Sequence, residues 1–311
     1  MDVILDVIDT FVFDRLYATI LPVSHTGPGY TALENQTTYN QHVGVYFPLE
    51  PSRWVGASQW KRDHITRQAL SLCLITWIFG LAMYLLGSTI VYHTLFDKNL
   101  LRHPRYLRNQ IRQEIKQGLT SIPVMAILTT PFFLAEIRGW SKLYDSSTSA
   151  PFSAYTYLQY PLFICFTDSG IYWIHRWLHL PRVYRWLHKP HHKWVVPTPF
   201  ASYAFHPLDG WSQSLPYHMF PFIFPLQKSA YLGLFIFVTV WTVLIHDAEY
   251  LSNSAIVNGA ACHTMHHLYF NYNYGQFTTF WDNMGGTYRK PKSDGFLGNL
   301  VDITQGVQKR D

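Results

Sequence analysis

Long apolar segments alternate with shorter polar ones along this chain. Residues 69–96 contain no charged side chain, and a helix of about 20 residues is enough to cross the apolar core of a bilayer. Residues 119–135 and 152–174 form two further apolar runs, and residues 212–245, with a single lysine, are long enough for a two-pass hairpin of short helices. The pattern predicts an all-α polytopic membrane protein with about four to five transmembrane helices.

The first 68 residues contain no apolar run of that length. Apolar residues recur at helical spacing over residues 1–20, but four aspartates in the same stretch exclude the basic start of a secretory signal peptide. We therefore predict a helix that lies at the membrane interface.

Basic residues follow the first predicted span. Between positions 97 and 118 there are six basic side chains and only two acidic ones. The six are Lys98, Arg102, Arg105, Arg108, Arg112 and Lys116. The positive-inside rule places this stretch in the cytosol, and the segment 1–68 on the lumenal side. More basic residues between 176 and 193 predict that the histidine-rich part of the chain is cytosolic as well.

The composition agrees with a membrane protein. Only 14% of the residues are charged, against about 25% in an average soluble domain. The net charge of +5 comes from basic residues beside apolar spans, where such residues contact anionic lipid. The charge therefore indicates a lipid surface and no nucleic-acid partner.

Histidines carry the chemical information. Eleven of the sixteen lie between positions 175 and 267. Eight form three clusters, and two more lie between them: the clusters are His175-Arg-Trp-Leu-His179, His188-Lys-Pro-His191-His192 and His263-Thr-Met-His266-His267, with His206 and His246 in between. Spacings of three and four residues bring side chains to one face of a helix. Because imidazole is the commonest protein ligand for iron, zinc and copper, we predict a polyhistidine metal site at the cytosolic membrane surface.

The number of histidines bears on which metal the site binds and on how many ions it holds. The zinc-protease signature HExxH is absent. A structural zinc site needs about four ligands and usually includes cysteine thiolates, so it accounts for neither the excess of histidines nor the lack of a thiolate set. Two metal ions with nitrogen-rich shells account for the number. Two irons could activate dioxygen at the membrane face, where a lipid substrate need not leave the bilayer.

The residues around the clusters narrow the interpretation. The informative stretches are Tyr172-Trp-Ile-His-Arg-Trp-Leu-His179, His188-Lys-Pro-His-His-Lys-Trp194, Pro197-Thr-Pro-Phe-Ala201, Phe205-His-Pro-Leu-Asp-Gly210, Trp241-Thr-Val-Leu-Ile-His-Asp247 and Gly275-Gln-Phe-Thr-Thr-Phe-Trp-Asp282. They resemble the sterol C5-desaturases, especially the fungal ones, of the fatty acid hydroxylase and sterol desaturase superfamily. With this resemblance the chain divides into a lumenal or interfacial segment 1–68, first transmembrane helices with a basic cytosolic loop 69–151, a fatty acid hydroxylase-like catalytic domain 152–290 and a tail 291–311.

The resemblance implies an activity and a set of ligands. It implies a cytosolic diiron domain in a multi-pass protein of the endoplasmic reticulum membrane. Its expected reaction is the introduction of the C5–C6 double bond into a Δ7-sterol, in sterol biosynthesis of the ergosterol type. The expected co-reactants are O2 and electrons from NAD(P)H, delivered by a reductase and cytochrome b5. Carried over position by position, the implied ligands of two irons are His175, His179, His188, His191, His192, His206, His246, His263, His266 and His267.

Three carboxylates are candidates for orienting the ligand imidazoles. Asp168 precedes His175 by two helical turns, and Asp247 and Glu249 directly follow His246. A carboxylate that accepts a hydrogen bond from a ligand imidazole fixes its tautomer and orientation. Each of the three could equally be an acid that meets arginine or water.

Two other functions stay open from the sequence. One is another oxygenase of the same superfamily, such as a sterol C4-methyl oxidase or a lipid hydroxylase. The other is a non-catalytic metal-binding membrane protein. Iron-dependent oxygen consumption with a Δ7-sterol separates an enzyme from a binding protein, and the product separates desaturation from hydroxylation.

Overall fold

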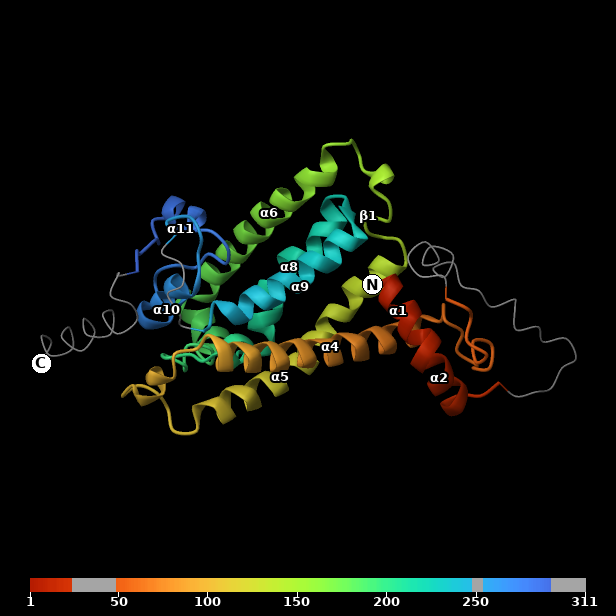
Figure 1. Cartoon of the computed structure of the whole chain (residues 1–311), viewed down its shortest axis with the longest axis horizontal. Helices are drawn as coiled ribbons and strands as arrows, with labels where there is room; N and C mark the ends of the chain where they lie inside the picture. Colours follow the sequence, from red (N-terminus) through yellow and green to blue (C-terminus); the bar gives the residue numbers. More distant parts are fainter. Residues whose placement is uncertain (24–48, 248–253, 292–311) are drawn as a thin grey trace, which may run out of the picture. The chain divides into compact units, whose positions relative to one another are not determined.

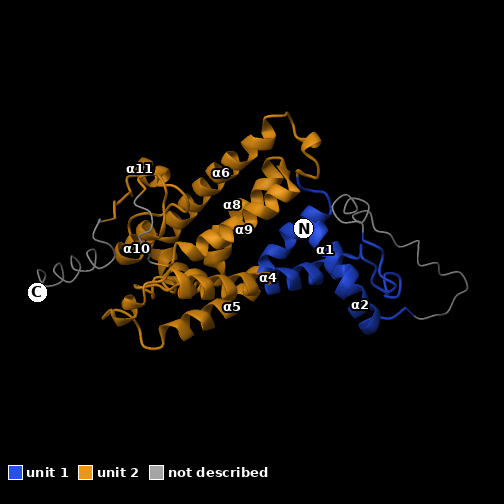
Figure 2. Cartoon of the chain, in the orientation of Figure 1, with its two compact units in different colours: residues 1–78, 126–141 blue, residues 79–125, 142–311 orange. Residues whose placement is uncertain are grey.

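The computed structural model describes residues 1–23, 49–247 and 254–291 (Figure 1). The chain forms two compact units, unit 1 with residues 1–78 and 126–141, and unit 2 with residues 79–125 and 142–311 (Figure 2). The described residues are mostly helical, as the sequence predicted. The elements are α1 (Asp2–Ile8), a π-helical turn (Asp9–Phe13), α2 (Asp14–Ile20), α4 (Ile65–Thr94), a 3-10 helix (Lys98–Arg102), α5 (Gln110–Ile137), β1 (Leu143–Tyr144), a 3-10 turn (Ser147–Ser149), α6 (Tyr155–Leu178), α7 (Pro181–Val183), a π-helical turn (Tyr184–His188), a 3-10 helix (Pro199–Tyr203), α8 (Pro207–Ile223), β2 (Leu226–Gln227), α9 (Lys228–Leu244), α10 (Ala260–Tyr269) and α11 (Phe280–Met284).

Unit 1 contains a buried cluster of two arginines and three aspartates. The Arg62 guanidinium donates to Asp6 Oδ1 at 2.6 Å and to both carboxylate oxygens of Asp14, at 3.0 and 2.5 Å. Arg67 donates to Asp9 Oδ1 at 2.8 Å and to Asp14 Oδ1 at 2.6 Å. All five side chains are buried. Because each guanidinium meets two carboxylates, the charges inside unit 1 are matched by partners from the same unit.

The three aspartates of this cluster come from the N-terminal helical segment 2–20, which consists of α1, the π-helical turn and α2. The same segment carries apolar side chains on its outer face. Phe11, Val12, Leu16 and Ile20 are all exposed, and Phe11 is 69% exposed. A helix with its acids inside and its apolar residues outside is the reverse of a helix on a water-soluble protein. The predicted N-terminal helix is therefore present, and its apolar outer face is of the kind that contacts lipid.

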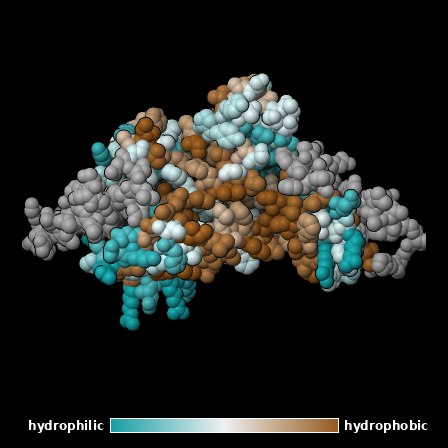
Figure 3. All heavy atoms as spheres, in the orientation of Figure 1, coloured by the Kyte–Doolittle hydropathy of each residue, from teal (hydrophilic) through white to brown (hydrophobic). Residues whose placement is uncertain are grey.

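Two helices are long and apolar enough to cross a membrane. They are α4 and α5, with 30 and 28 residues. Their apolar stretches are mostly unburied, and α4 exposes Ile78, Leu86 and Ile90. Figure 3 shows brown, hydrophobic residues gathered over the helices in the middle of the face it displays. These features support the predicted membrane protein through two spans of the described chain, and the remaining predicted spans correspond to the shorter or more polar helices α6, α8 and α9.

Unit 2 is built around α6, α8 and α9. Helix α6 packs along α8, with Phe163 and Phe220 in edge-to-face contact at 5.1 Å between ring centroids. The predicted hairpin 212–245 is present as α8 and α9, joined by the short strand β2. That strand pairs in parallel with β1, Leu143 with Leu226. The C-terminal end of α6 and the residue after α9 meet α10, through His175 with His266 and His246 with His263, and the N-terminal end of α8 meets the π-helical turn Tyr184–His188.

Candidate metal centre

The nine histidines at the centre come from four separate segments. His175 and His179 lie at the end of α6, and His246 follows α9. The π-helical turn Tyr184–His188 and the turn after it carry His188, His191 and His192, and α10 carries His263, His266 and His267. All are buried except His179, which is half-buried. Segments that are far apart in sequence therefore converge on one buried cluster of imidazoles.

The imidazoles form two groups. The five-histidine group contains His175, His179, His188, His192 and His266, and the four-histidine group contains His191, His246, His263 and His267. Within each group one nitrogen of every ring lies within 4.8 Å of one nitrogen of every other ring. That spacing is compatible with one metal ion at the centre of each group.

Each of the two HxxHH sequence clusters contributes two histidines to one group and one histidine to the other. His188 and His192, four residues apart, belong to the five-histidine group, whereas His191 belongs to the other. In α10 the pair four residues apart, His263 and His267, belongs to the four-histidine group, and His266 belongs to the other. In α10, adjacent residues project about 100° apart around the helix, so His266 and His267 reach different groups. His191 and His192 lie in a turn and also reach different groups. Each HxxHH cluster therefore contributes to both groups.

Hydrogen bonds fix the tautomers of facing rings. His175 Nδ1 lies 3.0 Å from the carbonyl oxygen of Tyr274, and His188 Nδ1 lies 2.7 Å from Asp209 Oδ2. A carbonyl oxygen and a carboxylate only accept, so each Nδ1 carries the hydrogen. The Nε2 atoms of the two rings face each other at 3.1 Å, and in the neutral form that binds a metal ion neither of them carries a hydrogen. Two facing lone pairs repel, and a cation between them removes the repulsion.

Two more rings repeat the arrangement. His266 Nδ1 donates to the carbonyl oxygen of Tyr272 at 2.8 Å, and His246 Nδ1 donates to that of Thr242 at 2.7 Å. Their Nε2 atoms point to His192 Nε2 and His263 Nε2, both at 3.0 Å. Hydrogen bonds at Nδ1 that direct Nε2 inward are the usual support of metal-ligating histidines.

The electrostatics keep these rings neutral. Burial lowers the pKa of His191, His192 and His263 well below the ordinary value, and the neighbouring histidines lower it further. Nδ1 of His191 and Nδ1 of His192 are buried without a hydrogen-bond partner among the described residues. A neutral imidazole is the form that binds a metal ion. The donor set, all nitrogen with no thiolate, fits iron as well as the other metals that imidazole prefers.

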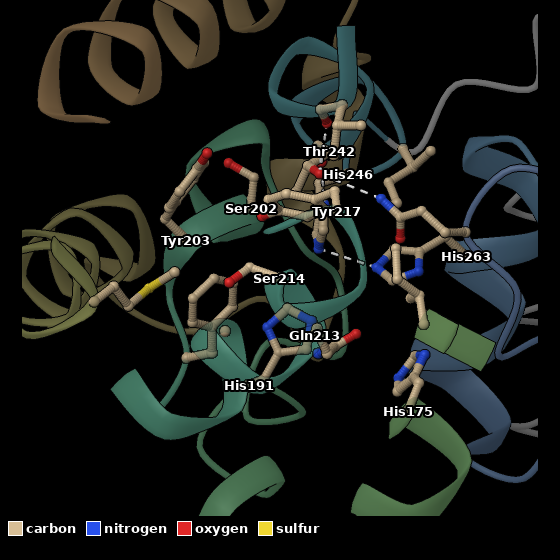
Figure 4. A pocket seen from close by; sticks show the side chains of 17 residues that line it. His175, His191, Ser202, Tyr203, Gln213, Ser214, Tyr217, Thr242, His246 and His263 are labelled. Atoms are coloured by element: carbon tan, nitrogen blue, oxygen red, sulfur yellow. Dashed lines mark hydrogen bonds between the residues drawn. The ribbon is translucent and has the colours of Figure 1, made fainter. Parts of the chain in front are cut away.

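A cavity opens beside the four-histidine group. It is partly open to the outside, and the free space in and in front of it amounts to about 650 Å³. The lining includes His191, His246 and His263 from the four-histidine group, and His175 from the other (Figure 4). Its apolar wall is formed by Met125, Ile171, Phe205, Val238 and Ile245. The four-histidine group therefore faces a space in which an apolar substrate could lie.

His206 lies outside both groups. It caps the N-terminus of α8, where its Nδ1 accepts a hydrogen bond from the Leu208 backbone amide at 3.2 Å. The structure therefore does not place it with the other nine predicted ligands, and its role as a ligand stays a prediction. His218, which the sequence clusters did not include, is buried in α8 against Phe235, away from both groups.

The three predicted carboxylates have different outcomes. Asp168 accepts hydrogen bonds from the backbone amides of Gln276, Phe277 and Thr278 and from the Thr278 hydroxyl, so it holds the loop after α10 and touches no imidazole through these contacts. Four donors already contact its two oxygens, and a role of Asp168 in orienting a ligand ring stays a prediction. Asp247 is buried next to His246, and its contact with a ring stays a prediction. Glu249 lies outside the described residues.

Asp209 is the carboxylate that sequence reasoning missed. It is fully buried in the first turn of α8, and its two oxygens bind His188 Nδ1 at 2.7 Å and Gln213 Nε2 at 2.8 Å. The sequence places it 21 residues from His188, so no local spacing connects the two. The stretch Phe205–Gly210 had marked the region only through its resemblance.

Comparisons with known proteins agree with this geometry. The fatty acid hydroxylase family model matches residues 160–287, which contain all nine histidines. The chain is 59% identical to the Delta(7)-sterol 5(6)-desaturase erg3B of Aspergillus fumigatus, over 100% of this chain and 91% of the relative. It is 54% identical to the Delta(7)-sterol 5(6)-desaturase of Leptosphaeria maculans, over 96% and 89% of the two chains, and 47% identical to the one of Saccharomyces cerevisiae, over 98% and 90%. No solved structure matches the chain.

Proposed function

This chain belongs to the Delta(7)-sterol 5(6)-desaturases of the fatty acid hydroxylase family, and we propose that it introduces the C5–C6 double bond into a Δ7-sterol at two irons held by its two histidine groups. It is a desaturase of sterol biosynthesis. The observation that carries the proposal is the four-histidine group that faces a partly apolar cavity. When bound, the two irons would supply the activation of O2 that breaking two unactivated C–H bonds requires.

The residues of the chain have separate tasks in this reaction. The reaction removes one hydrogen from C5 and one from C6, and with O2, two electrons and two protons it yields the diene and two waters. The nine imidazoles would hold the irons, and Asp209 and the backbone oxygens of Tyr272 and Tyr274 keep their rings turned inward. The apolar cavity wall would hold the sterol rings and exclude water from the carbons that react.

The electrons must come from a partner. The two basic stretches 98–116 and 182–193 are connected by a hydrogen bond from Lys193 Nζ to Gln113 Oε1 at 2.7 Å. Their exposed basic residues are Lys98, Arg102, Arg108, Arg112, Lys116, Arg182, Arg185, Lys189 and Lys193. A basic surface next to the His188 turn suits an acidic electron donor, so we propose cytochrome b5 with its NAD(P)H-dependent reductase. The protein would then lie in the endoplasmic reticulum membrane as a multi-pass protein with its metal centre toward the cytosol.

Sterol analysis tests the activity. Expression in cells that lack their own C5-desaturase should convert a Δ7-sterol into a Δ5,7-diene with its characteristic ultraviolet absorption, and mass spectrometry identifies the product. An oxygenated C4-methyl sterol or a 2-hydroxy acyl lipid as the main product would place the chain elsewhere in the superfamily. Elemental analysis of the purified protein should give about two irons per chain, as two histidine groups imply. One stoichiometric zinc without iron in active protein would contradict the iron assignment.

A labelling experiment tests the orientation. Single cysteines introduced next to Arg108 and next to Lys193 should react with a membrane-impermeant reagent in intact, right-side-out vesicles of endoplasmic reticulum, because both stretches are expected to be cytosolic. Protection of either site in these vesicles, with labelling after detergent treatment, would reverse the orientation.

A further inference from the structure

Gln213 connects the cavity to the metal centre. It lies one helical turn after Asp209 on α8, and its Nε2 donates to Asp209 Oδ1 at 2.8 Å. The other oxygen of the same carboxylate accepts from His188 Nδ1. A single buried carboxylate thus holds both a histidine of the five-histidine group and a side chain that lines the cavity.

This contact sets the direction of the Gln213 amide. A carboxylate only accepts hydrogen bonds, so the NH2 group must face Asp209 and the carbonyl oxygen must face away from it. Among the described residues, none donates a hydrogen bond to that carbonyl oxygen. Gln213 lines the cavity together with His175 and His191, and in Figure 4 it is drawn between His191 and His263, with Tyr203 at the left of the view. The cavity therefore presents a fixed hydrogen-bond acceptor close to the imidazoles.

The chemistry of the substrate requires an acceptor in this place. A sterol has one hydroxyl group, on C3, and only three bonds separate its oxygen from C5 and four from C6. When C5 and C6 lie at the four-histidine group, the hydroxyl must lie in the same part of the cavity. Groups on the far side, such as Tyr203, are then beside the apolar rings. A buried hydroxyl without a partner loses the free energy of its hydrogen bonds with water, so a partner near the histidines is needed.

We propose that the side-chain oxygen of Gln213 accepts the hydrogen of the sterol 3-hydroxyl and thereby sets which carbons lie at the irons. Asp209 is the positioning residue that holds the amide in this direction. The inference rests on the proposed sterol desaturase function and adds the group that recognises the head of the sterol. Gln276 is the other amide in the cavity, and its Nε2 donates to the Thr242 hydroxyl at 3.2 Å. Its partner is a hydroxyl, which can both donate and accept, whereas the partner of Gln213 is a carboxylate that only accepts and so fixes the direction of the amide. We therefore assign the role to Gln213.

A binding experiment with two ligands tests the assignment. The full chain is purified in detergent and kept without reductant, so that no turnover occurs, and binding of radiolabelled 5α-cholest-7-en-3β-ol is compared with binding of its 3-deoxy analogue. Gln213→Met keeps the length of the side chain and removes the acceptor. It should weaken binding of the sterol about tenfold, the value of one well-placed hydrogen bond, and change binding of the 3-deoxy analogue by less than about twofold. Iron content and abundance report whether the variant is folded.

The matched variant Gln276→Met distinguishes the two amides. It should leave the preference for the sterol over the 3-deoxy analogue as in the unmodified protein. Equal loss of both ligands in Gln213→Met, or no loss of either, would overturn the assignment, and loss of the preference in Gln276→Met alone would transfer it to that residue. If the unmodified protein bound neither ligand and formed no diene, the sterol desaturase function itself would fail, and that result is distinct from a failure of Gln213.

Discussion

Unit 1 and unit 2 both bury a cluster of strongly polar side chains, but those in the cluster of unit 1 form ion pairs with one another, whereas those in the cluster of unit 2 are all imidazoles. In unit 1, Arg62 and Arg67 meet Asp6, Asp9 and Asp14, and every charge has an opposite charge at hydrogen-bond distance. In unit 2, nine imidazoles face one another, and the chain supplies no cation between the facing nitrogens among the described residues. Buried polar groups that are paired with one another stabilise the fold. Buried nitrogen atoms that face one another without a donor between them indicate a bound ligand.

The largest loss of activity is expected when a histidine of the two groups in unit 2 is removed. His191→Ala removes a ligand from the four-histidine group and His266→Ala removes one from the five-histidine group, and either should abolish the diene and lower the iron content. Sterol profiling and elemental analysis measure the two effects on membrane-inserted protein. The control is His218→Ala, which removes a buried histidine outside both groups and should keep most of the activity. Loss of activity in the control at normal abundance would show that the set of nine is incomplete.

Removing a member of the ionic cluster in unit 1 should lower the stability of the protein and leave its iron binding unchanged. Asp14→Ala removes the carboxylate that Arg62 and Arg67 share. Each guanidinium keeps one carboxylate, but Arg62 Nε loses its acceptor inside the buried cluster, which costs about 1–3 kcal/mol of the free energy of unfolding. Thermal unfolding in detergent measures the loss, and the iron content of the protein that remains folded should be unchanged. The control is Asp63→Asn, because Asp63 is exposed. A melting temperature for Asp14→Ala equal to that of the control would refute the structural role of the ionic cluster.

Asp209 links a buried carboxylate to the metal centre, because its Oδ2 accepts the hydrogen of His188 Nδ1 in the five-histidine group. Asp209→Asn replaces the charged acceptor of the His188 Nδ1 hydrogen by a neutral amide. Loss of such a partner lowers metal affinity by about 10–100-fold. Iron retained against increasing chelator measures the affinity. The same conservative change at Asp282, which is buried and holds the backbone amides of Tyr274 and Gly275, should affect stability more than iron affinity. Iron affinity unchanged in Asp209→Asn would disprove the link.

The smallest effect is expected for His206. As the cap of α8, its replacement in His206→Ala should cost about 1 kcal/mol of stability, with diene formation close to that of the unmodified protein. Thermal unfolding and sterol profiling measure the two quantities. Complete loss of the diene with little loss of stability would return His206 to the ligands.

The sequence predicted the membership of the centre better than its arrangement. Helical spacing assembled eight of the nine histidines into three clusters, because local periodicity determines which side chains share a helix face. The resemblance added His246, and with it His206, which lies outside both groups. The division into five and four depends on how α6, the turn at His188, α9 and α10 meet, and these contacts are long-range. For the same reason Asp209 was not among the predicted carboxylates, since it lies 21 residues from His188, the histidine that it contacts.

The membrane segments show the same limit. The uninterrupted run 69–96 predicted α4 almost to its ends, because length and apolarity alone identify a span. The second run contains prolines at 123 and 131, and α5 continues through both. Neighbouring helices can satisfy the backbone carbonyls that a proline leaves free. The inverted face of residues 1–20 was not predictable from that stretch, because its acids are buried only through Arg62 and Arg67.

The shared HxxHH clusters also bear on how the centre is loaded. Because the cluster at His188 and the cluster in α10 each serve both groups, the first ion to bind would draw in segments that the second ion also needs. Part of the ordering cost of the second site is then already met, and we expect the two irons to bind cooperatively. Under iron limitation the enzyme would therefore divide into fully loaded and empty molecules, and the rate of diene formation would follow the number of complete centres rather than the average iron per chain.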